Sequence, residues 1–165
     1  MSLRPLVLWP DPRLSTVCAP VGEITGEVEA LAVDLLETMY AAEGRGLAAP
    51  QVGVLQRVFV TDVGWKEGAR VPRVFINPVL EEAGAAELTQ DEGCLSIPGV
   101  TVPVRRPEAV RFSWTALDGS AQRERFEGFA AVCMQHEMDH LEGVVTFDRL
   151  DAAARADLIA AYAAQ

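Results

Sequence analysis

The chain has 165 residues, half of them hydrophobic, and its 24 acidic and 14 basic side chains leave a formal net charge of −10. This length fits one domain with a sizeable buried core, so we expect residues 1–165 to form a single domain. Binding to nucleic acid through phosphate neutralisation needs a basic surface, and the acidic balance therefore argues against DNA as a direct ligand. A local basic patch at Arg105 and Arg106 stays open.

The N-terminal segment and the cysteines bear on the compartment. Pro5 and Pro10 interrupt the start before a signal-peptide apolar region could form. No stretch approaches the roughly 18 apolar residues of a membrane span. Three cysteines cannot all pair within the chain, and without an export signal this is typical of a reducing cytoplasm. We therefore expect a cytoplasmic protein with no membrane segment.

The first third of the chain predicts an arm followed by a helix. The first 20 residues are broken by prolines and are expected to lie as an extended arm over the core. Apolar residues then recur at helical spacing after Thr25, a candidate N-cap. Gly44 is placed to end this helix.

The middle of the chain predicts strands. Residues 58–63 and 73–76 are typical of short strands, the second ending at Pro78. Alternating residues in 110–116 and a turn at 117–120 predict a hairpin with 123–127.

From residue 128 the period becomes helical again. The predicted helix ends near Gly143, and the alanine-rich residues 151–164 predict a C-terminal helix. Helices and hairpins in this order favour an α+β domain with antiparallel sheets around a central helix.

The strongest chemical signal is His136-Glu137-Met138-Asp139-His140. Residues four apart share one face of a helix, so both imidazoles can bind one metal ion. Glu137 follows the first ligand and is placed to act as a general base. The chain holds only two histidines, so this spacing is unexpected by chance.

A third ligand must come from elsewhere. After His140 the only glutamate is the adjacent Glu142, so the carboxylate of a thermolysin-like set is missing. The longer metzincin pattern would need a histidine where Thr146 stands. Asp151 lies further downstream as a carboxylate that a metallopeptidase could use.

Cysteine is the better class of third ligand. Cys133 lies on the same helix as both histidines and seven residues from His140, or about 10 Å along the axis. One ion cannot comfortably take all three. Cys94 comes from a remote segment after Gly93 and is the better candidate, while Cys133 is expected to pack in the core.

A further segment, residues 44–51, carries two glycines that allow close backbone approach. It lacks the residues of a phosphate-binding loop. Gln51 at its end could offer an amide donor to a developing oxyanion.

Residues 44–51, 92–96 and 135–140 form a set in this order along the chain. They match G-x-G-L-A-A-x-Q, E-G-C-L-S and Q-H-E-x-D-H, and in this the chain resembles the peptide deformylases. The resemblance covers almost the whole chain. It implies one catalytic domain over residues 1–165.

The resemblance implies that Cys94, His136 and His140 hold one divalent metal ion. The family commonly uses Fe²⁺ in the cell, whereas Zn²⁺, Ni²⁺ or Co²⁺ can occupy the site in preparations. A thiolate with two imidazoles suits these ions better than Mg²⁺ or Ca²⁺. The sequence does not choose among them.

The implied reaction is hydrolysis of the N-formyl group from the first methionine of a newly made polypeptide. Glu137 is implied as the general base, with the Gln51 amide and the Leu95 backbone N–H holding the oxyanion. The implied partners are N-formylated nascent peptides, in a bacterial cytoplasm or an organelle. A transient contact with the ribosome stays open.

The implied substrate docks as an added strand, with the main chain at Gly46 as one contact. Gln135 and Asp139 are expected to be structural. The implied substrate pocket is lined by Gly44, Arg45, Gly46, Glu92, Phe129, Val132 and Cys133.

The chain departs from the family pattern at Arg45 and Gln90, where aliphatic or apolar residues are usual. In one interpretation Arg45 lays its methylenes along the pocket and its guanidinium in water. In the other, both residues make the pocket mouth polar and shift the preferred first residue away from methionine.

Three alternatives to the family's usual activity follow from these residues. They are a deformylase-fold hydrolase with a shifted substrate preference, a metallopeptidase, and a paralogue kept only for binding. The last of these is disfavoured because all the candidate residues are present: Gln51, Cys94, His136, Glu137 and His140.

Overall fold

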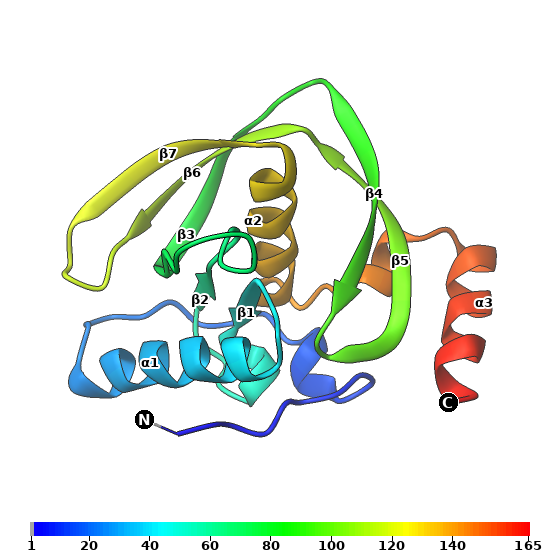
Figure 1. The fold of residues 1–165 in the computed structure, drawn as a ribbon, viewed down its shortest axis with the longest axis horizontal. Coiled ribbons are helices and arrows are strands. Elements are labelled where there is room, and N and C mark those ends of the chain that lie inside the picture. The colour runs from blue at the N-terminus through cyan, green and yellow to red at the C-terminus, as the bar shows by residue number, and fades with distance from the viewer. Residues whose placement is uncertain (1) are drawn as a thin grey trace.

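The computed structural model describes residues 2–165, so Met1 of the predicted arm lies outside the described residues (Figure 1). Three α-helices occur in the described chain: α1 (Gly26–Ala41), α2 (Gly128–Leu141) and α3 (Ala152–Ala163). The strands are β1 (Gly46–Ala48), β2 (Val58–Thr61), β3 (Arg73–Ala83), β4 (Glu87–Cys94), β5 (Ile97–Pro107), β6 (Ala109–Thr115) and β7 (Ala121–Glu127). Short 3₁₀ helices cover Pro12–Ser15, Ala49–Val52 and Thr146–Arg149.

Two antiparallel sheets surround α2. The larger has the order β1-β2-β3-β6-β7, and the smaller is the β4–β5 hairpin. Figure 1 shows α2 between them, with α1 beside β1 and β2 and α3 on the outer side of β5. The α+β prediction with antiparallel sheets around a central helix and a C-terminal helix is therefore confirmed.

The core on the sheet side of α2 is aromatic. Phe75, Phe112 and Trp114 of β3 and β6 pack against Ala131 and Met134 of the helix. This packing fixes α2 along its length, so side chains on its other face are held in place without any ligand.

The start of the chain is less regular than predicted. The arm is not extended throughout, because the 3₁₀ turn Pro12–Ser15 buries Leu14 completely. Thr25 is the N-cap of α1 by position, but its side chain makes no capping hydrogen bond. The left-handed residue after α1 is Glu43 (φ 57°), not Gly44. A Cβ at Gly44 would lie 2.8 Å from Leu95 Cδ1, so close packing explains this glycine better than helix termination does.

Two strand predictions were wrong in extent: β2 ends at Thr61 rather than at residue 63, and β3 is longer than predicted. β3 does not end at Pro78 but continues to Ala83, because an irregular register after Ile76, with Asn77 at φ 50°, accommodates a residue that has no N–H. The β4–β5 hairpin was not predicted, since the prolines of β5 weaken the strand pattern. The predicted 110–127 hairpin is confirmed as β6 and β7.

Among residues 2–165, no helix combines the length and the apolar character that crossing a bilayer requires.

Candidate metal centre and active site

Three predicted ligands converge at one end of a cavity. His136 and His140 lie one turn apart on α2, with ring centroids 5.1 Å apart. Cys94 ends β4, where the pairing with β5 is irregular, and its Sγ lies 3.4 Å from His140 Nε2. One donor atom from each residue lies within 4.8 Å of the others. We call these three residues the donor cluster.

The donor cluster fits a tetrahedral metal ion. Ligands at about 2.0–2.3 Å from Zn²⁺ lie a few ångströms from each other, as these donors do. His136 Nδ1 lies 2.8 Å from Glu92 Oε1, which leaves Nε2 as its free donor atom. Burial and the neighbouring His136 lower the pKa of His140 well below its ordinary value, so its ring stays neutral. The donor set suits a borderline-soft divalent ion.

His136 differs from His140 in its electrostatics. Burial disfavours its charged form, but hydrogen bonds to Cys94 and Glu92 outweigh burial and raise its pKa well above the ordinary value. This raised pKa applies to the protein without a metal ion, because a bound ion would compete with the proton for the His136 ring.

Glu137 lies beside the donor cluster with one oxygen unused. Its carboxylate is buried, and Oε2 has no hydrogen-bond partner among residues 2–165. Burial, together with the negative charge of Glu92, raises the pKa of Glu137 to about 7, although nearby His136 opposes the shift. A Cβ at Gly46 would lie 2.5 Å from Glu137 Oε1, so this position needs glycine. Such a carboxyl group is suited to take up and release a proton near neutral pH.

Behind the donor cluster lies a second group of charges, which we call the paired cluster: Arg106, Glu92, Asp139 and Arg149. Arg106, only 3% exposed, donates from Nε and Nη2 to both oxygens of Glu92, at 2.6 and 2.9 Å. Its Nη1 donates to Asp139 at 3.0 Å. Glu92 links this cluster to His136.

The paired cluster corrects one expectation and confirms another. Arg106 is buried, so the open interpretation of a basic surface patch is wrong. Asp139 binds Arg106 and Arg149, and the Gln135 side chain donates to Pro107 O and Ala131 O, so both are structural as predicted. Sequence analysis missed the role of Arg106. The alternation of Val102, Val104 and Arg106 along β5 was the available signal, because it places the arginine on the buried face.

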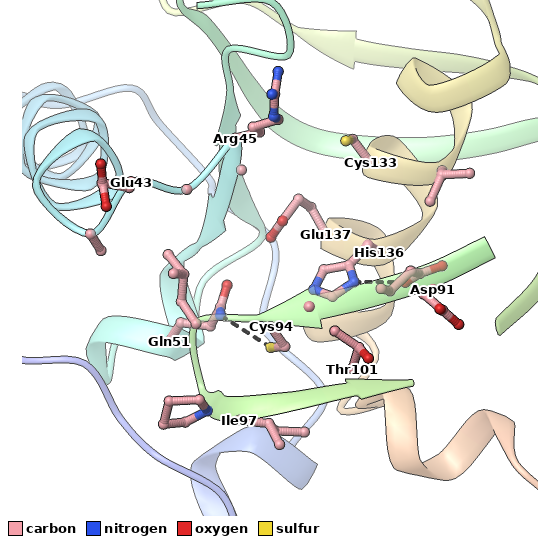
Figure 2. Close-up of a pocket in the computed structure, with 18 of the residues that line it drawn as sticks. Glu43, Arg45, Gln51, Asp91, Cys94, Ile97, Thr101, Cys133, His136 and Glu137 are labelled. Carbon is pink, nitrogen blue, oxygen red and sulfur yellow. Dashed lines mark hydrogen bonds and ion pairs between the residues drawn. The ribbon is translucent and has the colours of Figure 1, made fainter. Parts of the chain in front are cut away.

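Gln51 is held with its amide toward the donor cluster. Its Oε1 accepts from Ala48 N at 2.9 Å, which sets the orientation of the amide. Nε2 then donates to Ser96 Oγ at 3.1 Å and faces Cys94 Sγ at 3.7 Å (Figure 2). The predicted amide donor therefore points into the site.

A cavity of about 750 Å³ opens beside these residues. It is lined by every residue predicted for the site apart from the buried His140: Gly44, Arg45, Gly46, Gln51, Glu92, Cys94, Leu95, Phe129, Val132, Cys133, His136 and Glu137. Gln90 is not among the lining residues, so its predicted place at the mouth is wrong.

Cys133 lies at the end of the site remote from Cys94 and Gln51 (Figure 2). It is half-buried and lines the cavity, so the prediction that it packs in the core is wrong. Burial, with the charges of Glu137 and Glu92, raises the pKa of its thiol to about 12, and it stays protonated. Only Cys94 joins the histidines in the donor cluster.

Comparison with known proteins decides the family. A family model described as polypeptide deformylase matches residues 3–156. The chain belongs to the peptide deformylase family. A peptide deformylase from Alkalilimnicola ehrlichii is 50% identical over 151 residues, covering 91% of this chain and 83% of the relative. One from Rhizorhabdus wittichii is 46% identical over 155 residues, covering 91% and 88%.

Solved structures of deformylases agree with this membership. A peptide deformylase from Synechococcus elongatus in complex with actinonin has a TM-score of 0.92 at 37% identity, covering 97% of this chain and 88% of that one. One from Legionella pneumophila also reaches 0.92, at 33% identity and with 99% and 95% coverage. The predictions of family, of fold class and of a deformylase enzyme are confirmed.

Proposed function

We propose that this deformylase is a metal-dependent hydrolase that removes the N-formyl group from the first methionine of newly made polypeptides. The observation that carries this proposal is the donor cluster with Glu137 beside it, at one end of a cavity. Residues 1–165 would act as one catalytic domain on N-formylated nascent peptides. The bacterial relatives support a bacterial cytoplasm, and a transient ribosome contact stays a prediction.

Cys94, His136 and His140 would hold the metal ion, and we propose Fe²⁺ in the cell, with Zn²⁺, Ni²⁺ or Co²⁺ in preparations. A divalent ion there would polarise the formyl carbonyl and make water a stronger nucleophile. Cys94 would bind as thiolate, so metal affinity falls in acid.

Glu137 would move the proton. Its Oε2 has no protein partner in the described chain and would accept a proton from the attacking water. A carboxyl group with a pKa of about 7 then returns this proton to the leaving amine. The C–N bond of the formamide breaks, giving formate and a free N-terminus.

Gln51 and Leu95 would hold the substrate oxygen. The Gln51 Nε2 group donates one hydrogen to Ser96 Oγ at 3.1 Å, and its other contact, to Cys94 Sγ at 3.7 Å, is long. Its second hydrogen can therefore be donated to an oxyanion instead. Leu95 lines the cavity directly after Cys94, which brings its backbone N–H to the same side.

The peptide would bind along the free edge of β1. Among residues 2–165 that strand pairs only with β2, so its outer edge at Gly46 can accept an added strand. Because Gly44 and Gly46 have no side chain, neighbouring groups can lie close to this segment. Glu92 lines the cavity and orients His136. Arg45, Phe129, Val132 and Cys133 line the recess for the first side chain.

One experiment tests the proposal. Protein purified without oxygen is analysed for metal and assayed on one sample with formyl-, acetyl- and unblocked Met-Ala-Ser. We expect about one equivalent of metal, as one site of this type binds, and formate release from the formyl peptide alone. Cleavage of peptide bonds in any of the three, without formate release, would favour a metallopeptidase and contradict the proposal.

A further inference from the structure

We call the part of the cavity that runs along α2 away from the donor cluster the recess. Val132 and Cys133 lie about one turn before His136 on α2, and Phe129 about two turns before it. These side chains therefore line a wall that extends roughly 5–10 Å along the helix from the reacting centre. Arg45, from the segment leading into β1, lies at the far end (Figure 2).

The Arg45 guanidinium is held by several partners at the solvent-exposed end of its side chain. Its Nη1 donates to Val63 O and, at 2.7 Å, to Glu67 Oε2, and its Nη2 donates to Glu67 Oε1 at 2.5 Å. Its Cζ lies 5.5 Å from the Phe129 ring centroid, in the range of a cation–π contact. The side chain is 24% exposed and its bonds to Glu67 lie at the surface, so the guanidinium faces solvent as predicted but is also ion-paired there.

Glu67 supplies the opposite charge from outside the cavity. It follows Lys66, is 65% exposed at the side chain, and is not among the residues that line the cavity. Its carboxylate meets the guanidinium in a two-point contact, which is the strong geometry for this pair. The Arg45–Glu67 pair therefore carries no net charge.

The other charged residues around the cavity do not replace Glu67. Glu43, Lys66 and Asp91 also line the cavity, but the only carboxylate bonded to Arg45 in the described chain is Glu67. Without it, Arg45 would keep its place through Val63 O and Phe129 and present an uncompensated charge to the recess.

We propose that Glu67 is a specificity-determining residue, which neutralises Arg45 and so keeps the recess selective for uncharged first side chains such as methionine. This inference rests on the proposed function, because the first side chain enters the recess only if the formyl group lies at the donor cluster. Glu67 would act through Arg45 and would not touch the substrate.

The test is a Glu67→Gln variant, which keeps the shape and an acceptor oxygen but removes the charge. We would measure kcat/KM for formyl peptides beginning with Met, Gln, Glu and Lys. Glu81→Gln is the matched control, since Glu81 makes a similar exposed pair with Arg123 and does not line the cavity.

We expect Glu67→Gln to raise the ratio of formyl-Glu to formyl-Gln turnover about two- to fivefold, the size that a partly exposed ion pair supports. The change should appear in KM and shrink with added salt, because a charge that acts equally on bound substrate and transition state changes binding. Formyl-Lys should become a poorer substrate. The Glu81→Gln ratio should match wild type.

A double variant tests whether Glu67 acts through Arg45. In Arg45→Met/Glu67→Gln the gain for formyl-Glu should vanish, because the charge that attracted it is gone. An unchanged ratio in Glu67→Gln, an equal rise in Glu81→Gln, or a rise that persists in the double variant would each overturn the inference. Absence of formate release from every peptide in wild type would instead overturn the proposed function, and this inference with it.

Discussion

The donor cluster and the paired cluster are adjacent groups of buried polar side chains, yet their bonding differs. In the paired cluster Arg106 donates hydrogen bonds to two carboxylates, and Asp139 also accepts hydrogen bonds from Arg149. At the donor cluster, His140 Nδ1 and the neighbouring Glu137 Oε2 have no partner in the described chain. Glu92 belongs to the paired cluster and bonds to His136 of the donor cluster.

This difference separates positioning from reactivity. A buried polar group without a partner costs stability, so it persists only where its surroundings hold it in place. The paired cluster and the aromatic packing of α2 provide that rigidity, and they leave free the atoms that can bind an ion or move a proton. Substitutions at the donor cluster and at Glu137 should therefore reduce metal binding or turnover, whereas those in the paired cluster should mainly reduce stability.

The largest effect should come from the donor cluster. Cys94→Ser should lose the metal and reduce formate release to background, because a hydroxyl is a poor substitute for thiolate. Cys133→Ser is the control and should retain about one equivalent of metal, since Cys133 lies outside the donor cluster. Metal analysis and turnover on the same samples check this. Equal metal loss in both variants would contradict the ligand assignment.

Glu137→Gln should separate binding from chemistry. The amide keeps the shape but cannot accept the proton, so turnover should fall by about 10²–10⁴. Metal content should stay unchanged, because Glu137 is not in the donor cluster. Steady-state kinetics with metal analysis measures both, and full activity would remove Glu137 from the mechanism.

Arg106→Met should act mainly on stability. It leaves Glu92 without its buried partner, and breaking such a pair costs about 3–5 kcal/mol of unfolding free energy. Metal affinity should also fall by about 10–100-fold through the Glu92–His136 contact.

Urea unfolding and metal titration would measure the two effects of Arg106→Met. Arg149→Met, at a side chain that is 45% exposed, is the control and should cost no more than about 1 kcal/mol. Similar losses of unfolding free energy in both variants would show that the buried Arg106–Glu92 pair contributes no more than the exposed Arg149 pair.

The smallest effect is a pH dependence of the paired cluster. Burial alone would raise the pKa of Glu92, but its bonds to Arg106 and His136 prevail and hold it below the ordinary 4.5. A lowered folded pKa gives stability that is present above the unfolded pKa and is lost as pH falls through the folded one. Metal-free wild type should therefore lose stability below about pH 4.5 more steeply than Glu92→Gln.

Urea unfolding at stepped pH checks this slope. Glu124→Gln, in an exposed pair with Arg73, should follow wild type. If Glu92→Gln lost stability as steeply as wild type, the Glu92 carboxylate would not contribute to acid sensitivity.

Much of the candidate site follows from local spacing. The backbone geometry of a helix places residues four apart on one face, so His136, Glu137 and His140 indicated a metal site before any tertiary contact was known. The same rule located α1 and α2, alanine-rich composition located α3, and period-two alternation located the β6–β7 hairpin. Cys94 was the better ligand for a geometric reason too, since a helix cannot bring Cys133 and His140 to one ion.

Only the tertiary structure decided which charges pair. Arg106 bonds to residues 14 and 33 positions away, and Arg45 to a residue 22 away. No periodicity connects such partners, because their distance depends on how the β4–β5 hairpin and the 62–72 segment fold against α2 and β1. Burial makes Arg106 a support for His136 rather than part of a basic surface patch. Pairing with Glu67 neutralises the charge of Arg45 beside the cavity.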